Sequence, residues 1–520
     1  MNGADLLCDT LLANGVDVCF ANPGTSEMHF VAALDRKPQM RCMLGLFEGV
    51  VTGAADGYAR MTGRPAATLL HTGPGLANGL ANLHNARRAR TPMVNVVGDH
   101  ASWHLVNDAP LTSDIEGLAR PMSHFVRRID GAGDVRRATE EAWTASLGLP
   151  GIATLILPAD AAWGAVAPET PTALARPLLP APSADTVDEA ARAIREAKAA
   201  GRKVTLLVAG QALRTRPLAV AGRIAARYGL RLLSPMSNPR IERGAGRLAV
   251  PKVPYPVDVS LPMLADIDLL VLAGAAVPVA FFGYPGKPGR LIRDDCRVVT
   301  LAGPCDDVPA ALDGLADALG VPAEGEGLAV AAAGRPPRPT GALTPETAAQ
   351  AVAALLPEDA IICDESITAS GHVFAHTAGC PPHDYLQITG GAIGIGIPMA
   401  AGAATACPDR KVVATQADGS AMYTIQGLWT QARENLDVVT VVFSNRTYAI
   451  LNGEMRGVGV NQVGLNARRM LNLDDPALDF VSIARGMGVE AARADTADEL
   501  VKQLDGAMGR RGPFLIEAVL

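Results

Sequence analysis

Short apolar runs alternate with longer segments of helical spacing along the whole chain. In the first third, the runs that predict strands are 16–21, 44–47, 67–70 and 93–97. The segments between them with helical spacing include 4–14 and the small-residue stretch 49–60. Continuous apolar runs of this length are typical of strands buried on both faces, and their alternation with helices predicts a parallel, doubly wound sheet. We therefore expect an α/β domain over residues 1–167.

Two proline-rich stretches, 168–182 and 334–341, separate the rest of the chain into two further segments. In the middle segment, strands are predicted at 204–208, 230–233, 269–272 and 298–301. In the last segment, a helix is predicted at 344–356 and strands at 360–363, 412–414, 438–443 and 515–519. Each pattern again predicts an α/β domain with a parallel sheet. We therefore expect a central domain at 183–332 and a C-terminal domain at 342–520.

Composition limits the classes of function. A length of 520 residues suggests about three domains. The net charge of −7 argues against a basic surface for nucleic acid, and no apolar run approaches the ~18 residues of a membrane span. The eight cysteines form no CxxC pair, and the N-terminus has no basic region of the kind that opens a signal peptide. We expect a cytoplasmic protein with reduced cysteines.

The most informative motif lies between residues 416 and 451. Asp418 follows one predicted strand and Asn445 follows the next, and the carboxyl ends of parallel strands are where open α/β sheets bind ligands. A carboxylate and an amide oxygen suit Mg²⁺ on a diphosphate, with the Thr447 carbonyl as a third ligand. Gly419 and Ser420 leave backbone N–H groups free for phosphate oxygens. An Asp helix cap followed by a surface Asn turn is the alternative interpretation.

This segment resembles the diphosphate- and magnesium-binding motif of thiamine diphosphate (ThDP) enzymes, although Ala417 stands where that motif begins with Gly. The whole chain resembles the ThDP-dependent decarboxylase and acetolactate synthase superfamily. The resemblance implies ThDP and Mg²⁺ as cofactors, a first domain that binds the aminopyrimidine, a structural central domain and a last domain that binds the diphosphate. It also implies that cofactors lie between the first domain of one subunit and the last domain of another, so a homodimer is the minimum and tetramers are usual.

Glu48 follows an apolar run and precedes the segment GVVTGAADGYAR, so we expect its carboxylate to be buried. Burial disfavours the charged form of a carboxylate. EGVVTGAADGYAR resembles the glutamate segment of the family, which implies that Glu48 binds and protonates the pyrimidine ring of the cofactor. A buried Glu that is paired with an Arg is the alternative.

Further cofactor contacts come from the resemblance alone. Ile393 stands at the place of the apolar side chain that holds the cofactor in its bent form, with an ordinary core residue as the alternative. Thr368 corresponds to a diphosphate contact in benzoylformate-decarboxylase-like members, and Leu451 is expected beside the cofactor.

The substrate-side residues resemble benzoylformate decarboxylase. Ser26 is expected to orient the substrate carboxylate and His71 to relay protons, each after a predicted strand. Members of that group have a second histidine in the central domain, and segment 279–284 of this chain contains none. Its possible replacements are His29, His100 and His104, of which His104 is our choice.

The nature of the substrate side chain stays open. Phe281, Phe282 and Tyr284 could line an apolar pocket, whereas Glu454 is polar where benzoylformate decarboxylases have an aromatic residue. An aromatic substrate is therefore not favoured.

The sequence thus predicts a ThDP- and Mg²⁺-dependent lyase that acts on a small 2-oxo acid, by decarboxylation alone or followed by carboligation. An acetolactate synthase is the main alternative, and the presence of Ser26 and His71 argues against it. A flavin-dependent pyruvate oxidase is less favoured because the central segment has no dinucleotide signature. A non-catalytic ThDP-binding paralogue is disfavoured because it has no need of Glu48.

Overall fold

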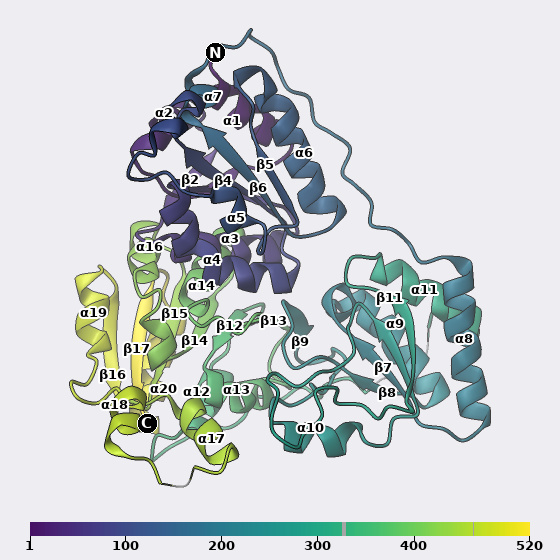
Figure 1. Cartoon of the computed structure of the whole chain (residues 1–520). Helices are drawn as coiled ribbons and strands as arrows, with labels where there is room; N and C mark the ends of the chain where they lie inside the picture. Colours follow the sequence, from purple (N-terminus) through teal and green to yellow (C-terminus); the bar gives the residue numbers. More distant parts are fainter. Residues whose placement is uncertain (325–328, 461) are drawn as a thin grey trace.

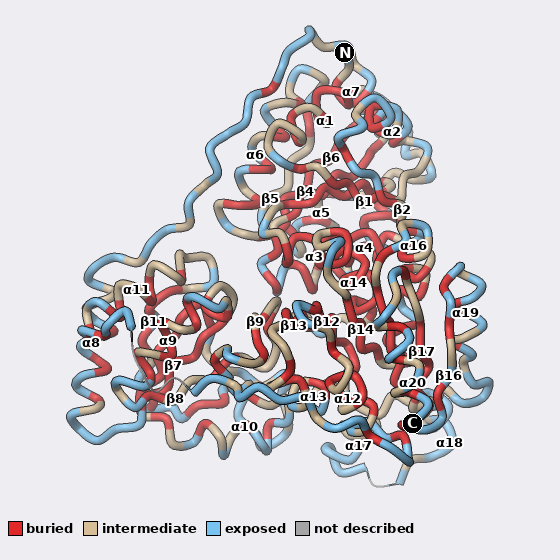
Figure 2. The backbone as a smooth tube through the Cα atoms, turned by 180° about the vertical axis from the view of Figure 1, so that it is seen from behind, coloured by how far each residue is buried: buried red, intermediate tan, exposed pale blue. Residues whose placement is uncertain are grey.

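The computed structural model describes residues 1–324, 329–460 and 462–520 and contains three α/β units, each with its own sheet (Figure 1). A long connection that follows the N-terminal unit runs along the outside of the molecule to the central unit, and it is mostly exposed (Figure 2). The predicted α/β fold with doubly wound sheets is confirmed.

The N-terminal sheet has six parallel strands in the order β2-β1-β3-β4-β6-β5. Its strands are β1 (Val18–Asn22), β2 (Arg41–Leu44), β3 (Ala66–Leu70), β4 (Met93–Asp99), β5 (Phe125–Arg128) and β6 (Ile152–Pro158). The helices are α1 (Gly3–Ala13), α2 (Met28–Asp35), α3 (Glu48–Thr62), α4 (Thr72–Ala89), α5 (Ile115–Ala119), α6 (Val135–Gly148) and α7 (Ala159–Trp163). The carboxyl ends of β1 and β3 are adjacent, which brings the residues after these two strands together.

The strand predicted at 44–47 is wrong in position. The structure places β2 three residues earlier, and Phe47 is already the N-cap residue of α3. Because β2 is the edge strand and pairs only with β1, its first two residues are exposed and need not be apolar. The apolar run 44–47 therefore lies mostly in the turn after β2 and marks that turn instead of the strand itself.

The central sheet has four parallel strands in the order β11-β10-β7-β8. They are β7 (Val204–Val208), β8 (Arg231–Leu233), β10 (Leu269–Ala273) and β11 (Arg297–Ala302). The helices of this unit are α8 (Ala184–Ala199), α9 (Thr215–Tyr228), α10 (Val257–Leu264) and α11 (Val308–Leu319). Each of the four strands overlaps a strand predicted for the central segment.

The C-terminal sheet has seven strands in the order β16-β17-β15-β14-β12-β13-β9. Its own strands are β12 (Ile361–Glu365), β13 (His383–Gln387), β14 (Val412–Ala417), β15 (Val438–Ser444), β16 (Glu490–Ala494) and β17 (Phe514–Val519). The helices are α12 (Pro345–Ala354), α13 (Ser370–His376), α14 (Gly396–Ala406), α15 (Asp418–Ala421), α16 (Gly427–Arg433), α17 (Ala449–Gly457), α18 (Leu465–Leu471), α19 (Phe480–Gly486) and α20 (Ala497–Met508).

This sheet differs from the sequence prediction in several places, and its strands β13 and β16 lie outside every strand predicted for the last segment. The short strand β9 (Ile241–Arg243) belongs by sequence to the central segment, yet it pairs antiparallel with β13 at the edge of the C-terminal sheet. After β14, the chain forms two short helices, α15 and α16, with a turn at 422–426 between them.

The N-terminal and C-terminal units pack through α3 and α14, which lie next to each other between the two sheets (Figure 1). A Cβ atom at Gly57 would lie 2.1 Å from the Met399 carbonyl oxygen, and one at Gly402 would lie 1.8 Å from the Ala54 carbonyl oxygen. Only glycine allows backbones to approach so closely. The small residues of segment 49–60 therefore allow the close helix packing that their composition predicts.

The structure also bears on the predictions from composition. All eight cysteines are free, as expected for a chain without a disulfide framework. Within the described parts of the chain, no helix combines the length and the apolarity that a membrane span requires.

Candidate active site in two halves

Glu48 is the first residue of α3, and its side chain is largely buried, with the residue 7% exposed. Its Oε2 accepts a hydrogen bond of 3.0 Å from the Asn78 side chain of α4. Among the described residues, Glu48 has no Lys, Arg or His within ion-pair distance. The alternative of a Glu paired with an Arg is therefore wrong, and the carboxylate is available for another partner.

Gly75, in the first turn of α4, separates Glu48 from His71. A Cβ atom at Gly75 would lie 2.9 Å from Glu48 Oε1 and 3.3 Å from His71 Cβ. The two side chains therefore flank the same glycine, at the carboxyl end of β3. Glu48 and His71 thus lie at one edge of the N-terminal sheet.

A carboxylate that the sequence prediction overlooked, Glu27, organises this edge. It is 2% exposed and accepts hydrogen bonds from the Gly24 backbone N–H (2.7 Å), from Ser26 Oγ (2.5 Å) and from His71 Nδ1 (2.8 Å). Ser26 Oγ also lies 3.3 Å from His71 Nδ1. Since Nδ1 of His71 faces a buried carboxylate, we assign the ring proton to Nδ1, which leaves Nε2 free for a substrate.

The space that Glu27 and His71 occupy depends on two glycines. A Cβ atom at Gly98, near the end of β4, would lie 1.8 Å from Glu27 Oε1. One at Gly24 would lie 2.1 Å from His71 Nδ1. Gly24 follows β1 and Gly98 lies near the end of β4, the two strands that flank β3. These glycines are the signal in the sequence that could have revealed a packed side-chain network there. We call Ser26, Glu27, Glu48 and His71 the N-terminal half-site.

The other candidate histidines lie outside this network. His104 is in the 3-10 helix η2 (Ser102–Asn107), where its Nδ1 contacts the Asn107 side-chain nitrogen at 3.1 Å and its ring lies 5.7 Å from the ring of His100. His29, on α2, lies against the ring of Trp163. No hydrogen bond between described residues joins any of the three to His71 or Glu48. The role of His104 as a second relay therefore stays a prediction.

The metal motif has the geometry that its spacing predicts. β14 and β15 are parallel neighbours in which Ala417 pairs with Phe443, so Asp418 and Asn445 both emerge at the carboxyl edge. Asp418 is buried and accepts hydrogen bonds from the backbone N–H groups of Gly419 (2.8 Å) and Arg446 (2.6 Å). Burial raises the pKa of Asp418, while these hydrogen bonds oppose the rise. A bound cation would favour the ionised form.

The donor set at this edge fits Mg²⁺. Asp418 supplies a carboxylate, Asn445 an amide oxygen and Thr447 a carbonyl, which are the hard oxygen ligands that Mg²⁺ prefers. Among the described residues, no group of three or more His, Cys, Asp or Glu side chains could hold a metal ion, so a cation here would also depend on amide, carbonyl and ligand oxygens. A Cβ atom at Gly419 would lie 2.3 Å from the Tyr448 ring, so a larger residue at that position would have to displace this ring.

Together with Ser420, these residues form what we call the C-terminal half-site: Asp418, Gly419, Ser420, Asn445 and Thr447.

The loop that carries Ile393 is held from two sides. Glu365, which is fully buried, accepts hydrogen bonds from the backbone N–H groups of Gly394 (2.7 Å) and Gly396 (2.7 Å). Burial raises the pKa of Glu365, while these hydrogen bonds oppose the rise. From the N-terminal unit, Asn85 donates to the Ala392 carbonyl oxygen at 2.7 Å and accepts from the Gly390 N–H at 3.0 Å. Neither anchor was predicted from the sequence.

The remaining predicted cofactor contacts are accessible. Ile393 is partly buried, Thr368 is exposed on the short helix η5 (Ile367–Ala369), and Leu451 is 43% exposed near the start of α17. Their exposure leaves them free to meet a ligand, and their roles stay predictions.

Within one chain, the two half-sites do not meet. The Glu48 carboxylate faces Asn78 and Gly75, whereas Asp418 is bonded to the backbone that follows β15. Among the described residues, no hydrogen bond or ion pair joins a side chain of one half-site to a side chain of the other. Each half-site is therefore an open set of groups at the edge of its own sheet.

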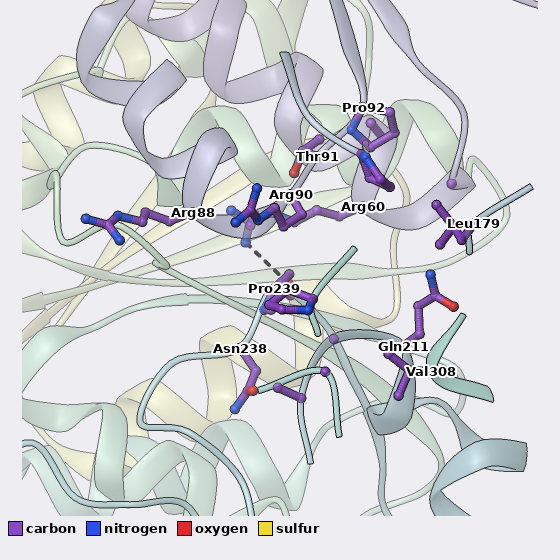
Figure 3. Close-up of a pocket in the computed structure, with 18 of the residues that line it drawn as sticks. Arg60, Arg88, Arg90, Thr91, Pro92, Leu179, Gln211, Asn238, Pro239 and Val308 are labelled. Atoms are coloured by element: carbon purple, nitrogen blue, oxygen red, sulfur yellow. Dashed lines mark hydrogen bonds between the residues drawn. The ribbon is translucent and has the colours of Figure 1, made fainter. Parts of the chain in front are cut away.

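The cavity in Figure 3 is a separate feature. It has a volume of about 480 Å³ and lies between the N-terminal and central units, and its wall contains none of the residues of either half-site. Arg60 crosses the junction there, because its Nη1 donates to the Pro239 carbonyl oxygen at 3.3 Å (Figure 3). The cavity thus marks a junction between units, away from the predicted catalytic groups.

Comparisons with known proteins agree with this division into half-sites. Residues 1–117 match the family model "Thiamine pyrophosphate enzyme, N-terminal TPP binding domain". Residues 368–518 match "Thiamine pyrophosphate enzyme, C-terminal TPP binding domain". The first match contains the N-terminal half-site and the second contains the C-terminal half-site.

Individual proteins are similar over the full length. The "Putative acetolactate synthase large subunit IlvX" of Mycobacterium tuberculosis is 51% identical, with 100% of this chain and 99% of that protein covered. The "Benzoylformate decarboxylase" of Pseudomonas aeruginosa is 31% identical over 98% of this chain and 97% of that protein. The structure of a ThDP-dependent 4-hydroxybenzoylformate decarboxylase from Rhodococcus jostii RHA1 superposes with a TM-score of 0.84 at 24% identity, covering 100% of this chain and 99% of that one, which supports the fold.

Proposed function

Because the chain belongs to the thiamine pyrophosphate enzyme family, we propose that it is a ThDP- and Mg²⁺-dependent lyase that acts on a 2-oxo acid. The reaction is non-oxidative decarboxylation, with transfer of the product to a second carbonyl compound as a further outcome. When bound, ThDP supplies the electron sink for cleavage of the carbon–carbon bond. The observation that carries the proposal is the His71 imidazole, held by Glu27 beside Ser26 and next to Glu48.

In this proposal, the N-terminal half-site moves protons. The buried Glu48 would contact the pyrimidine ring of the cofactor and exchange a proton with it. His71 carries protons to and from the substrate through Nε2, because Glu27 occupies its Nδ1. Ser26, which donates to Glu27, is close enough to His71 to orient the substrate carboxylate.

In this proposal, the C-terminal half-site binds the metal ion and the diphosphate of the cofactor. Asp418, Asn445 and the Thr447 carbonyl would hold Mg²⁺, and Gly419 and Ser420 would offer backbone N–H groups to the diphosphate. Ile393, Thr368 and Leu451 would contact the rest of the cofactor. His104 would be a second proton relay.

We also propose that two copies of the chain complete each site, so that a homodimer is the minimum active unit and a tetramer the expected assembly. The separation of the half-sites within one chain supports this arrangement, because a proton-moving half without a binding half has nothing to act on. The partner's C-terminal half-site would face Glu48, and each dimer would contain two equivalent sites.

Acetolactate synthesis is the alternative that one observation favours, namely the 51% identity to a protein with that name. The Glu27–His71 pair argues for decarboxylation, since aldehyde release needs a proton donor that carboligation to a second oxo acid does not. A non-catalytic role is disfavoured because a protein that only binds the cofactor has no use for a buried, cation-free Glu48.

The test is turnover of a panel of 2-oxo acids by the full-length protein with ThDP and Mg²⁺. We expect CO₂ and an aldehyde from at least one 2-oxo acid, with loss of activity after chelation of the metal and recovery when Mg²⁺ is restored. Acetolactate from pyruvate as the main product would favour the alternative. Absence of CO₂ from every 2-oxo acid, with ThDP shown to be bound, would contradict both.

A further inference from the structure

A carboxylate at the boundary between the central and C-terminal units has two phenol partners and no cation. Glu454, on α17, accepts hydrogen bonds from Tyr255 Oη at 2.9 Å and from Tyr284 Oη at 3.1 Å. Both tyrosines come from the central unit, Tyr255 just before α10 and Tyr284 between β10 and β11. We call Tyr255, Phe281, Tyr284 and Glu454 the Glu454 cluster.

The charge of Glu454 is not neutralised by a neighbouring side chain. Among the described residues, no Lys, Arg or His lies within ion-pair distance of it. Lys287 is the nearby cation, but its ammonium lies 5.7 Å from the Tyr284 ring centroid and is paired with Asp258 at 2.7 Å. A carboxylate can accept roughly four hydrogen bonds, so two positions remain free after the phenols have bonded.

Aromatic faces surround this charge. The rings of Tyr255 and Phe281 are 5.4 Å apart, and Phe281 also contacts Phe282 edge to face with 4.8 Å between centroids. Phe281 is 42% exposed and Phe282 56% exposed. Aromatic faces next to a carboxylate make a favourable environment for an organic cation, through cation–π attraction and charge-assisted hydrogen bonds.

The Glu454 cluster lies beside the loop that carries Ile393. The Phe281 ring lies against the loop that carries Ile393, because a Cβ atom at Gly391 would be 2.6 Å from Phe281 Cζ. Glu454 itself is on the helix that begins four residues after Asn445. A 2-oxo acid whose carbonyl lies at the cofactor could therefore extend its side chain toward Glu454.

We propose that the Glu454 cluster binds the cationic end of the substrate, so that the preferred 2-oxo acid carries a guanidinium or ammonium group at the far end of its side chain. This inference rests on the proposed function and names its substrate class. The Glu454 carboxylate neutralises the charge, the Tyr255 and Phe281 rings cover its apolar faces, and the two phenols hold the carboxylate in position.

The experiment compares a cationic and a neutral substrate of similar length, 5-guanidino-2-oxopentanoate and 2-oxoheptanoate, in the wild type, in Glu454→Gln and in the control Glu490→Gln, whose carboxylate is exposed on β16. Loss of a charge-assisted contact should lower kcat/KM for the cationic substrate about 10- to 100-fold in Glu454→Gln and leave the neutral one within about threefold. Glu490→Gln should change neither. A second readout is competitive inhibition by 4-guanidinobutanoate relative to hexanoate, which should weaken in Glu454→Gln alone.

The outcomes separate this inference from the proposed function. A wild-type protein that decarboxylates the neutral substrate as well as the cationic one, or a Glu454→Gln variant that keeps its preference, would overturn the substrate class and leave the lyase proposal standing. If neither substrate nor any other 2-oxo acid releases CO₂ while ThDP is bound, the lyase proposal and this inference fall together. Tyr284→Phe, which removes one of the two phenol bonds, should show the same selective loss on a smaller scale.

Discussion

The two half-sites are built by different means. The C-terminal half-site consists of one carboxylate, one amide and backbone groups, placed by two adjacent parallel strands and a glycine. The N-terminal half-site consists of side chains that contact each other, because Glu27 is hydrogen-bonded to both His71 and Ser26. Glu27 and His71 are 44 positions apart along the chain. We propose binding for the half-site made of backbone groups and strand spacing, and proton transfer for the half-site made of ionisable side chains in contact.

This difference also explains what the sequence could predict. Asp418 and Asn445 were predictable because strand topology alone brings them together, and Glu48 because a recognisable segment follows it. Glu27 was overlooked although it is adjacent to Ser26, because its importance depends on a contact with a neighbouring strand and on the space left by Gly98. Short-range patterns do not reveal such packing.

The same limit applies to the fold. Central strands with continuous apolar runs, such as β7 and β15, were predicted within a residue or two. The edge strand β2 was displaced because only one neighbour buries it, and β9 was missed because three residues carry too little pattern. Its pairing with β13 depends on how the units meet, which no local signal contains.

The largest effect is expected in the N-terminal half-site, where the substitution of Glu48 should slow proton transfer. Glu48→Gln keeps the shape and the contact with Asn78 but cannot donate a proton as a carboxyl group does. We expect exchange of the C2 proton of bound ThDP to slow by up to about 10⁴-fold, with cofactor affinity nearly unchanged. Rapid-quench exchange followed by NMR measures it, with Glu116→Gln on α5 as the control. Exchange at the wild-type rate would mean that Glu48 has a structural role only and takes no part in proton transfer.

In the C-terminal half-site, we expect a substitution to lower cofactor affinity. Asp418→Ala removes the only carboxylate among the proposed metal ligands and should weaken ThDP binding in the presence of Mg²⁺ about 100- to 1,000-fold. Calorimetric titration measures the Kd, and Asp495→Ala, which removes an exposed partner of Arg493, is the control. Unchanged affinity in Asp418→Ala would remove the metal assignment.

A selective effect on product release should follow from loss of the relay. In His71→Ala, aldehyde formation should fall about 100-fold while KM changes little, because the lost group donates a proton and does not anchor the substrate. Product analysis by gas chromatography gives the rate. If turnover stays within about threefold for every 2-oxo acid, far below what a positioned acid supplies, then His71 is structural and the decarboxylase proposal loses its main support.

The smallest effect is predicted for the residue that acts through another. Glu27→Gln keeps a hydrogen-bond acceptor for His71 but loses its charge, so kcat should fall about tenfold through misorientation of the ring, with KM preserved. Glu27→Asp retains the charge and should recover part of the loss. A fall in thermal stability without a change in kcat would instead show that Glu27 serves the fold.

The most direct test of the account asks whether the two half-sites of different chains form one site. Glu48→Gln and Asp418→Ala, each inactive alone, are mixed at equal concentration under conditions in which subunit exchange is verified by mass spectrometry. In a mixed dimer, one site carries both substitutions and the other carries neither, so about a quarter of the wild-type activity should return. Persistent inactivity of the verified mixed dimers would contradict a site shared between subunits.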